Sequence, residues 1–174
     1  MDTVDRMTPA ELLQDAFDRI LQTASGAVDG LSDDQLAARP APDANPIGWL
    51  VWHLARVQDD HVADVAGTDQ VWTAQDFVSR FDLPFDSGET GYGMSSEQVG
   101  QVRVSAELLT DYLGAVHRAT SSYLAGLDAE DLDRVVDERW DPPVTLGVRL
   151  VSVVSDDLQH AGQAAYVRGL VAEE

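Results

Sequence analysis

An apolar run near the C-terminal end of the chain is interrupted by ionisable side chains in the stretch SDDLQHAGQAAY, residues 155–166. On a helical wheel of about 100° per residue, Asp156 and His160 fall within one narrow sector on the apolar face. A carboxylate and an imidazole four residues apart stand one turn apart, so both can reach one metal ion. Because burying a lone carboxylate is costly, we expect Asp156 to face a cation. Asp157 falls about 100° away and is expected at the boundary of the core or in solvent.

A second imidazole comes from an earlier segment, NPIGWLVWHLARVQDDH, residues 45–61. His53 shares a helical face with apolar residues of this segment, so its side chain is expected to point toward the same centre as Asp156 and His160. Two imidazole nitrogens and one carboxylate oxygen suit a divalent first-row metal. We expect zinc, with nickel and iron as alternatives. Three protein ligands leave coordination positions open for water or substrate, which favours chemistry or ligand capture over a structural role.

The same spacing also fits an interpretation without a metal. A histidine on the inner face of a helix is usually a core residue that is hydrogen-bonded to a neighbour. An aspartate one turn from a histidine can simply pair with it. The spacing alone leaves both interpretations open.

Further polar residues fall near the predicted metal face. Asp60 and Gln163 lie on the metal side of their helices, and we expect them either to orient a ligand imidazole or to form ordinary buried hydrogen bonds. His61 lies eight residues after His53, about 12 Å along a helix axis, so the two cannot easily bind one ion. His61 is therefore expected at the edge of the core. His117 lies beside the apolar stripe of another helix and is not expected to be a ligand.

Arg149 shares the inward sector of the fourth helix and lies about 10 Å nearer its start than the predicted ligands. It is a candidate to bind a substrate carboxylate, and the alternative is an ion pair with an acidic neighbour. Several aromatic residues in the connecting segments are expected either to line a pocket over the metal or to close one end of the core. They are Trp72, Phe81, Phe85, Tyr92 and Trp140.

Four long segments with helical periodicity must position these side chains. Their capping residues and apolar stripes predict helices over about residues 8–30, 45–67, 105–127 and from 145 nearly to the C-terminus. The stretch between the second and third helices is rich in Gly, Pro and Ser and forms a long crossover. The sequence therefore predicts an all-α fold, a four-helix bundle in a single domain over residues 1–174.

Composition narrows the classes of function. All 11 basic residues are arginine, and 31 acidic residues give a net charge of −20 at pH 7 with histidine neutral. Such a surface repels phosphate backbones and anionic lipid heads, so we expect neither a nucleic acid nor a membrane as partner. The chain has no cysteine, so any thiol chemistry must come from a co-substrate. The N-terminal stretch lacks the basic and apolar parts of a signal peptide, and we expect a cytoplasmic protein.

The segments WHLARVQDDH, after NPIGW, and DDLQHAGQAAYVRG resemble the DinB-like superfamily, most closely its mycothiol-dependent branch that includes the metal-binding domain of maleylpyruvate isomerase. The resemblance covers essentially the whole chain and implies a bundle of up-down-down-up order. It also implies a metal held by a histidine from the second helix and two ligands four residues apart on the fourth. His53 matches the first ligand, and His160 opens HAGQ, the form of the His-x-Gly-Gln motif found here. Asp156 takes the position that is histidine or acidic in different members.

This resemblance implies a metal-dependent thiol transferase that acts on an electrophilic small molecule, with mycothiol as the expected thiol. A divalent ion lowers the pKa of a coordinated thiol, which would attack the electrophile as a thiolate. The chain ends soon after the fourth helix, so we expect detoxification by S-transfer in place of the two-domain isomerase reaction. Two alternatives stay open: a hydrolase that uses metal-activated water, and a non-enzymatic metal-binding, stress-associated bundle. The resemblance also leaves a homodimer open.

Overall fold

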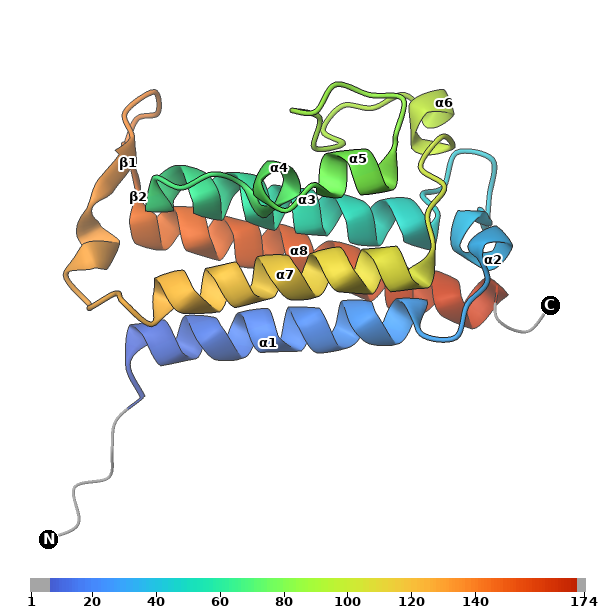
Figure 1. Cartoon of the computed structure of the whole chain (residues 1–174). Helices are drawn as coiled ribbons and strands as arrows, with labels where there is room; N and C mark the ends of the chain where they lie inside the picture. The colour runs from blue at the N-terminus through green and yellow to red at the C-terminus, as the bar shows by residue number, and fades with distance from the viewer. Residues whose placement is uncertain (1–6, 172–174) are drawn as a thin grey trace, which may run out of the picture.

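A computed structural model describes residues 7–171, so the first six residues of the N-terminal stretch considered above lie outside it. Four long helices lie side by side (Figure 1). Helices α1 (Pro9–Val28) and α8 (Leu146–Val171) run in one direction, and α3 (Ile47–Ala66) and α7 (Ala106–Leu124) run in the other. Both α1 and α3 pack mainly against α7 and α8. The all-α class is confirmed, and the directions of the helices are those of an up-down-down-up bundle.

Local capping interactions set where the long helices begin and end. Thr8 and Glu11 form a capping box at the start of α1, each side chain accepting the backbone N–H of the other residue. Ser105 caps α7, and the Thr145 side chain accepts an N–H from the first turn of α8 at 3.4 Å. Helix α3 ends at Gly67, whose φ of 67° is the left-handed conformation common after a helix. These are the boundaries that the sequence predicts.

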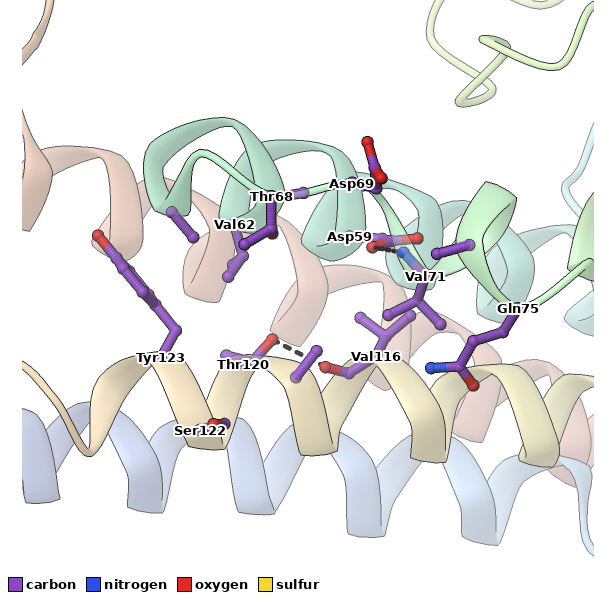
Figure 2. A pocket seen from close by; sticks show the side chains of 14 residues that line it. Asp59, Val62, Thr68, Asp69, Val71, Gln75, Val116, Thr120, Ser122 and Tyr123 are labelled. Atoms are coloured by element: carbon purple, nitrogen blue, oxygen red, sulfur yellow. Dashed lines mark hydrogen bonds between the residues drawn. The ribbon is translucent and has the colours of Figure 1, made fainter.

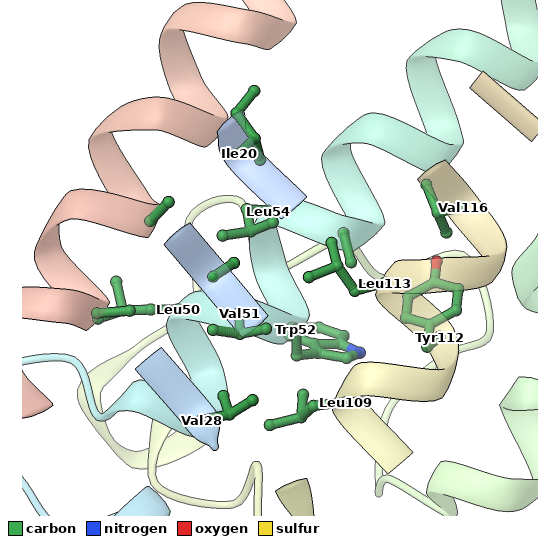
Figure 3. Close-up of a cluster of buried hydrophobic side chains, with 14 of the residues drawn as sticks. Ile20, Val28, Leu50, Val51, Trp52, Leu54, Leu109, Tyr112, Leu113 and Val116 are labelled. Atoms are coloured by element: carbon green, nitrogen blue, oxygen red, sulfur yellow. The ribbon is translucent and has the colours of Figure 1, made fainter. Parts of the chain in front are cut away.

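The core is one apolar cluster enclosed by the four helices (Figure 3). Its large side chains come from all four helices and include Ile20 of α1, Trp52 and Leu54 of α3, Tyr112 and Leu113 of α7, and Leu150 of α8. Each large apolar side chain contributes roughly 1.5–3 kcal/mol when it is buried. Helix packing therefore supplies the rigid frame on which α3 and α8 face each other. No helix within residues 7–171 has the length and apolar character that a membrane crossing requires.

The connections between the long helices contain short elements. Between α1 and α3 lies α2 (Asp33–Ala37), and between α7 and α8 lie a 3₁₀ turn, η1 (Asp131–Asp133), and an antiparallel hairpin of β1 (Val135–Asp137) and β2 (Val144–Thr145). The long crossover from α3 to α7 holds α4 (Val71–Ala74), α5 (Phe77–Phe81) and α6 (Ser96–Val99), and it lies over α3 and α7 (Figure 1). Because the crossover covers its outer side, α3 is buried over most of its length.

A buried carboxylate fixes the start of this crossover. The two oxygens of Asp59 accept the backbone N–H groups of Val71 at 2.8 Å and Trp72 at 2.7 Å, and the Tyr112 hydroxyl donates to Oδ2 at 2.8 Å. Burial raises the pKa of Asp59, while these hydrogen bonds and the nearby Arg56 act in the opposite direction. The Asp59 side chain of α3 thereby holds the first turn of α4 in place and also contacts α7 through Tyr112.

Arg56 is a second buried anchor, one turn before Asp59. Its Nε donates to the carbonyl oxygen of Glu89 at 3.1 Å, and its Nη1 donates to Gln70 Oε1 at 2.9 Å and to the Tyr112 hydroxyl at 3.1 Å. The same Nη1 lies 3.6 Å from Asp59 Oδ2. A buried charge must be paired and hydrogen-bonded to be tolerated, and these contacts meet that need for Nε and Nη1, whereas Nη2 has no hydrogen-bond partner within residues 7–171.

Asp157 corrects the prediction for α8. The sequence predicts this residue at the boundary of the core or in solvent, yet it is 0% exposed and neither carboxylate oxygen has a hydrogen-bond partner within residues 7–171. It belongs to the buried stripe of α8 that also contains Leu150, Val153 and Ala161. Burial raises the pKa of Asp157 well above its usual value, and the adjacent Asp156 raises it further. A helical wheel centred on Asp156 places Asp157 to one side, whereas the buried face of α8 includes Asp157.

Replacement of Asp59 by Ala should lower the free energy of unfolding by about 3–5 kcal/mol, because it leaves the buried Arg56 without its anionic partner and two backbone N–H groups without their acceptor. Denaturant unfolding of the purified protein measures this loss. Asp64→Ala, at an exposed position of the same helix, is the matched control and should change stability by less than about 0.5 kcal/mol. Equal losses in the two variants would contradict the anchoring role of Asp59.

Candidate metal centre

The three predicted ligands converge between α3 and α8. One candidate ligand atom from each of His53, Asp156 and His160 lies within 4.8 Å of the other two. His53 Nε2 is 4.0 Å from Asp156 Oδ2, and His160 Nε2 is 3.7 Å from Asp156 Oδ1. The two imidazole centroids lie 4.8 Å apart. The structure therefore brings together the side chains that the sequence singled out.

A backbone carbonyl of the crossover orients His53. The Nδ1 of His53 lies 2.5 Å from the carbonyl oxygen of Thr90. A carbonyl only accepts hydrogen bonds, so Nδ1 carries the proton and Nε2 turns its lone pair toward Asp156. Burial lowers the pKa of His53 although the Thr90 contact raises it, so the ring is favoured in its neutral form. Trp49 stacks on this ring, with centroids 4.6 Å apart and planes 15° from parallel.

Of the two residues expected to orient a ligand imidazole, Gln163 contacts one and Asp60 does not. Gln163 Oε1 lies 2.9 Å from Nδ1 of His160, so an oxygen acceptor again leaves Nε2 with a free lone pair. Asp60 does not contact a ligand imidazole, and its Oδ1 accepts a hydrogen bond from Gln70 at 2.8 Å. The partner of His53 is the Thr90 carbonyl instead. Sequence reasoning missed Thr90 because a backbone oxygen is present at every position and carries no residue-type signal.

Gly91 allows this close approach of the crossover to His53. Its φ is +97°, a conformation that residues with a Cβ rarely adopt. A Cβ built at this position would lie 2.7 Å from His53 Nδ1, 3.1 Å from Trp52 and 3.2 Å from Trp49. The absence of a side chain at residue 91 is therefore a condition for the hydrogen bond between His53 and Thr90.

The donor set fits a divalent metal. Asp156 Oδ2 is buried and has no hydrogen-bond partner within residues 7–171, although the side chain as a whole is 40% exposed. The simpler pairing of Asp156 with His160 is not a hydrogen bond, because 3.7 Å exceeds the usual limit. Two nitrogen lone pairs and a carboxylate oxygen without a partner form the kind of set that binds first-row divalent ions.

A cavity of about 470 Å³ opens beside these ligands. It is lined from α3, from the crossover and from α8 by His53, Val57, Asp60, His61, Thr90, Tyr92, Ser152, Val153 and Asp156. Of the aromatic residues considered from the sequence, Tyr92 lines it, with 90% of the residue exposed. Trp72 and Phe81 pack against each other and Tyr112 under the crossover, whereas Trp140 is exposed.

A second cavity, of about 410 Å³, lies between α3 and α7 and contains none of the three predicted ligands (Figure 2). Two of its polar side chains, Asp59 and Thr120, already have partners: Asp59 binds the start of α4, and Thr120 contacts Gln58 at 2.7 Å and the carbonyl oxygen of Val116 at 3.0 Å. The chemistry therefore points to the first cavity.

Two other predicted residues are engaged by neighbours. Arg149 contacts Asp137 Oδ2 at 3.1 Å and His61 Nδ1 at 2.9 Å, so its guanidinium forms the ion pair that was the alternative to binding a substrate carboxylate. His117 Nε2 lies 2.7 Å from Asp18 on α1, and neither residue belongs to the ligand cluster. Asp137 could not be predicted from the sequence, because its hairpin shows only weak alternation of apolar and polar residues.

Comparison with known proteins identifies relatives along nearly the whole chain. The mycothiol S-transferase family model matches residues 12–173. The crystal structure of a conserved protein from Enterococcus faecalis is 32% identical, covers 97% of this chain and 100% of its own, and superposes with a TM-score of 0.90. A DinB-like protein from Bacillus cereus is 19% identical, covers 89% of this chain and 87% of its own, and has a TM-score of 0.57, which indicates a shared fold. No curated protein matches the chain.

Substitution of either imidazole should abolish metal binding. Purified protein is expected to hold about one divalent ion per chain, and His53→Ala and His160→Ala should each lose it, because two remaining ligands bind much more weakly than three. Elemental analysis after dialysis measures the content. His117→Ala is the control and should keep its metal, since His117 pairs with Asp18. Full occupancy in His160→Ala would show that the ligand set is wrong.

Gly91→Ala should weaken metal binding about 10–100-fold, because the added Cβ displaces the Thr90 carbonyl from His53. Competition with a chromophoric chelator measures the affinity. Gly93→Ala is a closely matched control: φ is +74° there, so the backbone strain is similar, but a Cβ would meet nothing within 4 Å. If both variants lose the same affinity, backbone strain and not the contact with His53 is responsible.

Proposed function

Because the chain belongs to the mycothiol S-transferase family, we propose that it transfers a low-molecular-weight thiol, mycothiol, to an electrophilic small molecule. In this proposal His53, Asp156 and His160 hold a divalent metal, with zinc as the expected ion. The observation that carries it is the convergence of two imidazole lone pairs and a carboxylate oxygen beside a cavity, in a chain that has no cysteine of its own.

A divalent ion held by these residues would supply positive charge that lowers the pKa of a thiol nearby. The chain's own residues do the positioning. The Thr90 carbonyl and the Gln163 side chain fix which nitrogen of each imidazole is free, and Trp49 stacks against His53. The ligands thus keep one arrangement before any substrate arrives, which reduces the reorganisation needed during the reaction.

The cavity provides room for a small molecule next to this site. Its volume of about 470 Å³ falls within the range of small-molecule pockets, roughly 300–1,000 Å³. Its walls combine apolar Val57 and Val153 with polar groups from α3 and α8. During transfer, the thiol sulfur forms a bond to the electrophilic carbon, the leaving group departs with its electron pair, and the thiol proton passes to water.

Metal-loaded protein should consume mycothiol and monobromobimane together, with product measured by fluorescence and chromatography. Removal of the metal by a chelator should stop the enzymatic rate, and added zinc should restore it. His160→Ala should lose at least about 100-fold in rate if the ion contributes several kcal/mol. His117→Ala should keep the wild-type rate.

Two outcomes would contradict this proposal. Turnover of an ester or amide by metal-loaded protein without any thiol would indicate a metal-dependent hydrolase. Stoichiometric metal without either reaction, over a panel of electrophiles, would indicate a metal-binding bundle that is not an enzyme.

A further inference from the structure

His61 lies at the end of the cavity away from the metal ligands. It follows His53 by eight residues on α3, a rise of about 12 Å, and it lines the same cavity. The His61 side chain is 36% exposed, and its only hydrogen-bond partner within residues 7–171 is Arg149, at Nδ1. Its Nε2 is therefore available to a molecule in the cavity.

The contact with Arg149 decides where the proton of His61 lies. A guanidinium has donors and no acceptor, so Nδ1 of His61 must accept the hydrogen bond from Arg149 Nη1 at 2.9 Å. In the neutral imidazole the proton then sits on Nε2. Burial lowers the pKa of His61 and Arg149 lowers it further, against the carboxylates of Asp60, Asp64 and Asp156, which favours this neutral form.

The side chain of Arg149 is itself held in place. Its Nη2 donates to Asp137 Oδ2 at 3.1 Å, and the Asp137 side chain is only 5% exposed. Asp137 also accepts hydrogen bonds from the side chain of Arg139, at 2.9 and 2.8 Å, and from its backbone N–H. The hairpin between α7 and α8 thus orients Arg149, and Arg149 orients His61.

The other polar groups of the cavity are largely engaged. Asp60 accepts from Gln70, the Ser152 hydroxyl donates to the carbonyl oxygen of Arg149, and the Thr90 carbonyl binds His53. A carboxylate would be repelled by Asp60, whose Oδ2 lies 4.0 Å from His61 Nδ1, and the charge of Arg149 is already paired with Asp137. This end of the cavity suits an uncharged oxygen acceptor.

We propose that His61 donates a hydrogen bond from Nε2 to an uncharged oxygen, a carbonyl or a hydroxyl, of a substrate whose reacting atom lies at the metal ligands. This role rests on the proposed thiol transfer, because it assumes that a substrate spans the cavity. The oxygen belongs either to the electrophile or to the thiol. In both cases His61 is a substrate-binding residue and not a metal ligand.

Steady-state kinetics of zinc-loaded protein test the substrate contact. His61→Leu should raise one KM by about three- to tenfold, the loss expected for one neutral hydrogen bond. A higher KM for monobromobimane assigns the oxygen to the electrophile, and a higher KM for mycothiol assigns it to the thiol. His61→Gln keeps both an acceptor for Arg149 and an N–H donor, so it should restore most of the loss. Metal content should stay at the wild-type level in both variants.

A second measurement is independent of catalysis. Nitrogen-15 NMR of the metal-free protein at pH 7 should show His61 protonated at Nε2 and unprotonated at Nδ1. Arg149→Met should remove this preference, whereas His117→Leu should leave the His61 signals unchanged, because His117 pairs with Asp18.

The possible results separate the two proposals. A proton on Nδ1 of His61, or an unchanged KM for both substrates in His61→Leu, would overturn the role of His61. An equal rise of KM in His61→Gln and His61→Leu would also overturn it, since loss of the imidazole shape would then explain the result without a hydrogen bond to the substrate. If the wild-type protein consumes no thiol, the proposed function fails and the substrate role of His61 fails with it, while the NMR result still decides the state of its proton.

Discussion

Arg56 is a cation within the core of the protein, and its hydrogen bonds determine where residues 89–91 lie. Its Nε holds the carbonyl oxygen of Glu89, and the next carbonyl along the chain, that of Thr90, orients His53. Hydrogen bonds to a charged donor contribute about 1.5–3 kcal/mol, more than most neutral ones. A charge that cannot reach water thus holds the crossover at Glu89, and the neighbouring Thr90 carbonyl leaves Nε2 of His53 facing Asp156.

Three imidazoles, those of His53 and His160 at the candidate metal centre and that of His61 in the adjacent cavity, show how a partner at Nδ1 selects the chemistry at Nε2. His53 and His160 contact oxygen atoms through Nδ1, so Nε2 of each ring has a lone pair for a cation. His61 contacts Arg149 through Nδ1, so its Nε2 carries a proton and acts as a donor. Residues of the same type therefore take opposite roles at neighbouring positions, and the partner of Nδ1 in each ring decides whether Nε2 accepts or donates.

The sequence predicts much of the frame and less of what completes the site. Capping residues such as Thr8 and Ser105 act within one turn, so their effect is local and can be seen in the sequence. His53 and His160 are marked by their residue type and by helical spacing. Thr90 contributes a backbone oxygen, and it lies 37 residues after His53 in the sequence. Asp137 contributes a carboxylate that pairs with Arg149, and its position depends on a hairpin whose second strand has only two residues. Such long-range contacts have no periodic signal, and only the folded chain reveals them.

The adjacent residues Asp156 and Asp157 show why helical periodicity alone places a carboxylate poorly. Their side chains point in directions about 100° apart around α8. Asp156 therefore lies against α3 and the cavity, whereas Asp157 lies on the buried face of the bundle. In the apolar core the carboxyl group of Asp157 is favoured with its proton, which removes the charge that a metal ligand needs. Asp156 reaches solvent on one side and the two imidazoles on the other. A helical wheel centred on Asp156 misplaces Asp157, and the core tolerates Asp157 because a neutral carboxylic acid is much less costly to bury than its anion.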